Sequence, residues 1–119
     1  MRLEYEDYGE VVVLTPMDPR LDAAIAREFR DAALEMIQPQ HKICALDLSH
    51  VTFVDSTGIG AMIALMNGIG RERRLEVCGP APMVRKVFRM TRLDTVFNIE
   101  DSLAPVLASV SGESGNAAI

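Results

Sequence analysis

The stretch FVDSTGIGAMIALMNGIG, residues Phe53–Gly70, decides the fold and poses the question of function. Its apolar residues recur at intervals of three and four, which predicts a helix. Asp55, Ser56 and Thr57 at its start are residue types that cap helices. A short apolar link, residues 51–54, leads into Asp55, and the basic run Arg71–Arg74 is expected to end the helix with positive charge, which suits the negative end of its dipole.

The segments on either side alternate between strand and helix patterns. RLEYEDYGEVVVLTP (residues 2–16) predicts a strand pair around Gly9, or one short strand followed by a buried one, and KICALDL (residues 42–48) predicts a parallel strand that is covered on both faces. Asp22 is the expected N-cap of a helix that stops before Pro39, and Pro82 is expected at the start of another. Further strands are expected over residues 75–78 and 96–99, and a last helix over residues 103–110.

This order predicts an α/β fold with a small, mixed but mostly parallel sheet and right-handed crossovers. We expect four to five strands with about four helices packed on them. Residues 1–110 are expected to form a single domain, and the small polar segment SGESGNAAI, residues 111–119, a disordered tail.

Composition excludes several classes of function. The 119 residues carry a net charge of −5, which argues against general affinity for nucleic acid or anionic membranes. The longest uncharged run, residues 56–70, contains four glycines and falls short of a membrane span, so a cytoplasmic protein is expected. Cys44 and Cys78 lie in apolar stretches without second ligands at metal-site spacing, which predicts buried thiols and neither metal nor cofactor.

Ser56 has two chemical interpretations besides the capping role. A hydrolytic nucleophile would need an oriented base, but Val54 breaks the G-x-S-x-G pattern and only His41 and His50 exist, so an enzyme is not expected. The following helix carries no charge between Asp55 and Arg71. Its outer face is therefore either covered by another element or available to a partner.

A second set of charges follows along the chain. Arg85, Lys86, Arg89 and Arg92 mostly share one face of the predicted helix that begins near Pro82. They are interpreted as a solvated face or as a docking site for an acidic partner.

Two segments carry a resemblance to a known family. LDLSHVTFVDSTGIGAMIAL (residues 46–65) and LEVCGPAPMVRKVFRMTRLDTVFNIEDSLAPVL (residues 75–107) resemble the STAS domain of bacterial anti-sigma-factor antagonists. The resemblance runs from about Val11 to Leu107, and D-S-T-G is similar to that family's phosphorylation motif. It implies the STAS fold, in agreement with the α/β pattern.

The resemblance also implies a partner switch rather than an enzyme. A serine kinase that is itself an anti-sigma factor would phosphorylate Ser56, and a metal-dependent serine phosphatase would remove the phosphate. Asp55, Thr57, Gly58 and Asp22 would surround the phosphorylation site, and Ile59, Met62 and Met66 would contact the partner. The amides at the helix N-terminus would stabilise the phosphate. The alternative is a constitutive STAS subunit of a stressosome-like or lipid-transport assembly.

Overall fold

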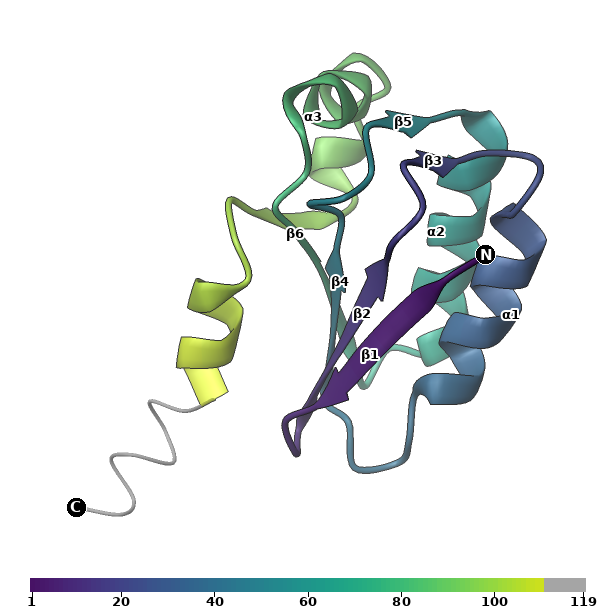
Figure 1. Cartoon of the computed structure of the whole chain (residues 1–119). Coiled ribbons are helices and arrows are strands. Elements are labelled where there is room, and N and C mark those ends of the chain that lie inside the picture. Colours follow the sequence, from purple (N-terminus) through teal and green to yellow (C-terminus); the bar gives the residue numbers. More distant parts are fainter. Residues whose placement is uncertain (111–119) are drawn as a thin grey trace.

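A computed structural model describes residues 1–110, which form a mixed five-stranded sheet with helices on both faces (Figure 1). The strand order is β1-β2-β4-β6-β7, and a separate pair, β3 and β5, lies beyond one end of this sheet. The strands are β1 (Leu3–Asp7), β2 (Val11–Pro16), β3 (Arg20–Leu21), β4 (Ile43–Asp47), β5 (Phe53–Val54), β6 (Arg74–Cys78) and β7 (Asn98–Glu100). The helices are α1 (Ala26–Met36), α2 (Ser56–Ile69), α3 (Pro82–Met90), the 3-10 turn η1 (Leu93–Thr95) and a helix over residues 104–110.

The predicted strand pair at the start of the chain is confirmed. β1 and β2 are antiparallel, with Tyr5 opposite Leu14, and Gly9 makes the connecting turn with a φ of +81°. A positive φ is readily adopted by glycine, so the turn has a local cause in the sequence. The remaining neighbours in the sheet, from β2 to β7, are parallel, as the alternation of strands and helices predicted.

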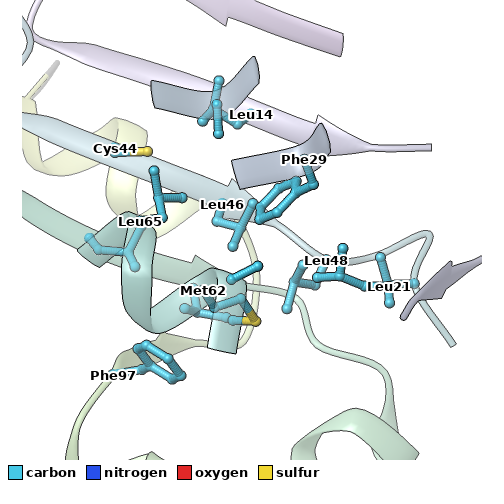
Figure 2. Close-up of a cluster of buried hydrophobic side chains, with 14 of the residues drawn as sticks. Leu14, Leu21, Phe29, Cys44, Leu46, Leu48, Met62, Leu65 and Phe97 are labelled. Carbon is cyan, nitrogen blue, oxygen red and sulfur yellow. The ribbon is translucent and has the colours of Figure 1, made fainter. Parts of the chain in front are cut away.

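The central strands are buried on both faces, as the continuous apolar runs predicted. Val12 and Leu14 of β2 face the core beneath α1 and α2, while Val11 and Val13 face a second core beneath the helix over residues 104–110. Figure 2 shows the first core, in which Leu14, Leu46, Phe29 and Leu65 converge from different elements.

The two cysteines are free and buried, as predicted, and they lie on opposite faces of the sheet. Cys44 belongs to the core beneath α1 and α2, whereas Cys78 belongs to the core beneath the last helix. A disulfide between them is therefore excluded by the pleat of the strands. Burial raises the pKa of both thiols to about 12, so neither is a reactive thiolate at neutral pH.

Some predicted boundaries were wrong. α1 begins at Ala26 with Ile25 as its cap, and Asp22 instead supports the preceding turn by accepting the N–H of Ala24 at 3.1 Å. α2 has no basic residue in its last turn, although Arg73 donates to the carbonyl of Ile69 at 3.1 Å from just beyond the helix. The last strand is Asn98–Glu100 rather than residues 96–99, because η1 occupies the chain just before it.

The prediction of a tail over residues 111–119 lies outside the described residues and stays a prediction.

Candidate functional site

The DSTG segment lies beyond the carboxyl ends of the parallel strands, where β3 and β5 pair (Figure 1). Leu21 pairs with Val54 in this short parallel ladder, so the next residues, Asp22 and Asp55, leave the two strands side by side. The carboxyl edge of a parallel sheet is where ligands commonly bind in α/β proteins. The loop after β3 and the start of α2 thus form one surface.

Asp55 is the N-cap of α2, and its carboxylate is fully engaged. Oδ1 accepts the N–H groups of Thr57 at 3.0 Å and Gly58 at 2.9 Å, and the hydroxyl of Thr57 at 2.5 Å. Oδ2 accepts the N–H of Ala23 at 3.3 Å, which ties α2 to the loop after β3. The Thr57 hydroxyl, followed by the Gly58 amide, lowers the pKa of Asp55, so this residue is an anion at neutral pH.

The two neighbouring hydroxyls differ in their availability. Thr57 donates its hydroxyl to Asp55, whereas the exposed Ser56 hydroxyl has no hydrogen bond within residues 1–110. The start of α2 also has fewer free N–H groups for a phosphate than the sequence predicted, because the N–H groups of Thr57 and Gly58 already donate to Asp55. Ser56 is consequently a free hydroxyl beside a fixed negative charge.

Position 58 requires glycine for a packing reason that is separate from any function. A Cβ at this position would lie 2.1 Å from the carbonyl oxygen of Leu21. The first turn of α2 therefore packs directly on the backbone of β3, which only glycine permits.

Asp22 lies close to the DSTG segment, because the backbone N–H of the next residue, Ala23, donates a hydrogen bond to Asp55. Its Oδ2 accepts from Nε of Arg20 at 3.1 Å, and the guanidinium of Arg20 lies 4.1 Å from the ring centroid of Phe53. β3 and the loop after it thus bring a cation, Arg20, and its paired carboxylate, Asp22, to the surface around Ser56.

The partner face predicted on α2 needs a correction. Met62 is fully buried and lies among the core side chains that include Leu48 and Phe97 (Figure 2), so the prediction that it contacts a partner was wrong. Ile59 and Met66 are half-buried and pack against the same core, and their contact with a partner stays a prediction. Gly60 and Asn67 are exposed residues on the outer side.

The uncharged outer face of α2 is covered by another element on one flank and left uncovered on the rest. α1 covers one flank of α2, where a Cβ on Gly68 would lie 2.8 Å from the Leu34 side chain. The rest of the outer side of α2, around Ile63 and Gly60, is half-buried or exposed within the described residues. That uncovered strip adjoins Ser56 at the start of the helix.

Neither histidine supports a hydrolytic serine. His41 precedes β4 at the opposite end of the sheet, where its Nδ1 accepts the N–H of Gln38 at 2.9 Å and its Nε2 lies 3.1 Å from Asp7. His50 is exposed in the loop after β4 and makes no hydrogen bond to Ser56 within residues 1–110. An oriented general base is the first requirement of such a nucleophile, and the described part of the chain does not supply one.

The described residues also contain no group of three or more histidine, cysteine or acidic side chains placed to hold a metal ion. Over the same residues, no helix is long and apolar enough to cross a membrane.

Sequence reasoning missed the pair of short strands and the surface next to it. β3 and β5 have two residues each, which is too short for any alternation to show. The pairing brings Arg20 onto Phe53, although 33 positions separate them. The apolar pair Phe53–Val54 directly before the polar DST segment was the local signal.

Comparison with known proteins identifies the fold family. The anti-sigma-F factor antagonist RsfB of Mycobacterium tuberculosis is 26% identical over 106 residues, which cover 89% of this chain and 86% of that protein. The crystal structure of an anti-sigma factor antagonist from Mycobacterium paratuberculosis matches with a TM-score of 0.81 at 24% identity, covering 92% of this chain and 93% of that one. The phosphorylated form of the Bacillus cell fate determinant SpoIIAA matches with a TM-score of 0.62 at 23% identity, covering 92% and 99%. The STAS domain profile matches residues 2–105, nearly the whole described chain, and this protein therefore belongs to the STAS domain family.

Proposed function

We propose that this protein is a cytoplasmic anti-sigma-factor antagonist that acts by partner switching. Its unphosphorylated form binds a serine kinase that is itself an anti-sigma factor, and phosphorylation of Ser56 ends that complex. A metal-dependent serine phosphatase restores the binding form. The relatives named as anti-sigma-factor antagonists support this role, and so does the chemistry of the D-S-T-G segment.

The observation that carries the proposal is the difference between the two adjacent hydroxyls. Ser56 is exposed and has no hydrogen bond within the described residues, whereas the Thr57 hydroxyl is held by Asp55. A kinase supplies its own base and its own nucleotide, so the substrate needs only an accessible hydroxyl in a defined place. Both residues are exposed, but the Thr57 hydroxyl would first have to give up its hydrogen bond to Asp55, whereas the Ser56 hydroxyl has none to give up within the described residues.

The effect of a phosphate follows from the charges around it. Phosphoserine adds about −1.5 to −2 charges at neutral pH. At position 56 these charges would stand next to the carboxylate of Asp55 and close to the uncovered strip of α2 around Gly60 and Ile63. Burying them against a partner would cost several kcal/mol as an order of magnitude, which corresponds to a loss of two or more orders of magnitude in affinity.

The test is to incubate the protein with purified serine kinases encoded in the same genome and with ATP, and to map phosphate by mass spectrometry. We expect one phosphate at Ser56, none on Ser56→Ala, and continued modification of Ser56 in Thr57→Val. Phosphate on Thr57, or no modification by any of these kinases, would contradict the proposal.

Binding measurements separate the switch from a constitutive subunit. For a switch, Ser56→Ala binds the kinase like the wild type, and the phosphorylated protein and Ser56→Asp bind it at least tenfold more weakly. A subunit of a larger assembly would stay bound whatever residue stands at position 56.

A further inference from the structure

A small apolar cavity lies between β5 and α3, beside the surface that carries Ser56. Its volume is about 90 Å³, and its lining is almost wholly apolar: Thr52, Phe53, Val54, Met83, Val84 and Val87. Sites for small molecules usually have volumes of about 300–1,000 Å³. A cavity of this size suits one aliphatic side chain of another molecule rather than a whole metabolite.

The apolar surface continues from the cavity along α3. Met83, Val87 and Met90 stand at i, i+4 and i+7 of this helix, and therefore share one side of it. Met83 is 65% exposed and Met90 is 74% exposed, and Phe53 on the opposite wall of the cavity is 40% exposed. We call the cavity together with this stripe the α3 groove. Methionine side chains adapt their shape readily, which suits a surface that receives another chain.

One unpaired cation borders the α3 groove on the helix. Lys86 is exposed, stands next to Met83 and Met90 on the helix surface, and is not paired with a carboxylate within residues 1–110, whereas Arg85 is paired with Asp101 at 3.0 Å. This positive charge lies beside the groove on a chain whose net charge is −5. The groove thus combines an apolar floor with one unneutralised positive charge at its rim.

We propose that the α3 groove binds an acidic amphipathic helix of a partner protein, with one aliphatic side chain in the cavity and a carboxylate paired with Lys86. Amphipathic helices bind grooves through apolar residues at this spacing, so the charges on their other positions determine orientation. The inference rests on the proposed function only where it identifies the partner as the kinase that acts on Ser56. Phe53 and Ser56 are three residues apart, so a kinase that contacts Ser56 would also reach the groove.

An anionic membrane fits these observations less well. Each cation near such a surface contributes roughly 1 kcal/mol, and on α3 only Lys86 both borders the groove and is unpaired within the described residues. The remaining surface is acidic overall and would be repelled. A cavity for a single side chain also has no counterpart in a fluid bilayer surface.

The seven methionines provide probes for the test, because two of them line the α3 groove. Protein with ¹³C-labelled methionine methyl groups is titrated with a synthetic helical peptide that carries leucine at i, i+4 and i+7 and glutamate elsewhere. We expect shifts of the Met83 and Met90 methyl resonances, with Met17 and the buried Met62 unchanged. A peptide with lysine in place of glutamate, and one with alanine in place of leucine, should each bind at least tenfold more weakly.

A matched pair of variants locates the binding. Met83→Glu combined with Lys86→Glu should reduce affinity for the acidic peptide at least tenfold, and Tyr5→Glu combined with Lys42→Glu on the far side should leave it unchanged. All four positions are exposed, so circular dichroism should show the wild-type fold for both variants.

Equal binding of the lysine peptide, unchanged Met83 and Met90 resonances, or shifts of these resonances with phosphatidylglycerol vesicles but not with the peptide would overturn the proposal. Concentration-dependent shifts without any peptide would instead identify a second copy of the chain as the occupant and would also overturn it. The assay contains neither kinase nor ATP, so its outcome is independent of whether Ser56 is phosphorylated.

Discussion

Gly58 in the first turn of α2 packs against the carbonyl oxygen of Leu21, so closely that a Cβ would lie 2.1 Å from that oxygen. The contact joins α2 to β3, and the hydrogen bond from Ala23 to Asp55 joins the N-cap of α2 to the loop that follows β3. Together they hold the start of α2, and therefore Ser56, against the loop that carries Asp22. The position of the serine is thus defined by backbone contacts and by one carboxylate.

Two glycines of α2 should respond to alanine in opposite ways. Gly58→Ala should lower the free energy of unfolding by at least about 2 kcal/mol, because the backbone of β3 cannot move aside easily. A methyl group at Gly60 would meet no neighbouring element within 4 Å, so Gly60→Ala should raise stability by about 0.5–1 kcal/mol. Urea denaturation of both variants measures the difference. Equal effects would contradict the close approach of α2 to β3.

The hydrogen bond between Thr57 and Asp55 should be visible in the titration of Asp55. Because the Thr57 hydroxyl is the largest cause of the lowered pKa, Thr57→Val should raise the pKa of Asp55 toward its ordinary value. A lowered carboxyl pKa stabilises the fold above the ordinary pKa, and this contribution is lost as pH falls through the folded value. The wild type should therefore lose more stability than Thr57→Val on acidification. Carboxyl ¹³C NMR measures the pKa, with Thr91→Val as the control.

Met62 and Met66 should separate core packing from partner binding. Met62→Ala removes a fully buried side chain and should cost about 2–5 kcal/mol of stability, whereas Met66→Ala, which is half-buried, should cost less than half as much. Thermal unfolding measures both. At a temperature where both variants are folded, only Met66→Ala should weaken the kinase complex, and an effect of Met62→Ala of the same size would contradict the assignment of Met62 to the core.

Glu76 should make stability depend on pH in the opposite sense to Asp55. Arg74 donates to its Oε1 at 2.6 Å, but its Oε2 is buried without a hydrogen-bond partner within residues 1–110. Burial raises the pKa of Glu76, and Arg74 opposes this shift only in part. A raised carboxyl pKa means that the folded state binds the proton more tightly, so stability falls as pH rises through the folded pKa.

The stability of Glu76→Gln relative to the wild type should accordingly be greater at pH 7 than at pH 4. Urea denaturation at both values measures it, and the exposed Glu72→Gln should show no such trend. A difference that is independent of pH would contradict the burial argument for Glu76.

Local patterns predicted the parallel core of the fold. The continuous apolar runs of β2 and β4 indicated burial on both faces, and Gly9 and Pro82 marked a turn and a helix start where the structure has them. These features depend on residues within a few positions of one another. The capping role of Asp55 is another such short-range feature, because its hydrogen-bond donors Thr57 and Gly58 follow it within three positions.

The buried side of α2 was not predictable in the same way. A helix with charges on one side reveals its solvent face by its period, but this helix is apolar or small on nearly every side. Met62 and Met66 therefore look alike in sequence, and only the position of α2 on the sheet buries the first of them completely.

By itself the sequence determined the alternation of strands and helices, the hydroxyl pair after Asp55 and the absence of charge on α2, because these follow from composition and short-range spacing. Only the tertiary structure decided why Gly58 must be glycine and that Phe53 lines one cavity together with Met83 and Val87. These depend on the pairing of β3 with β5 and on the packing of α3 beside it. Contacts between residues 30 or more positions apart leave no periodic trace in the chain, so they appear only once the sheet has assembled.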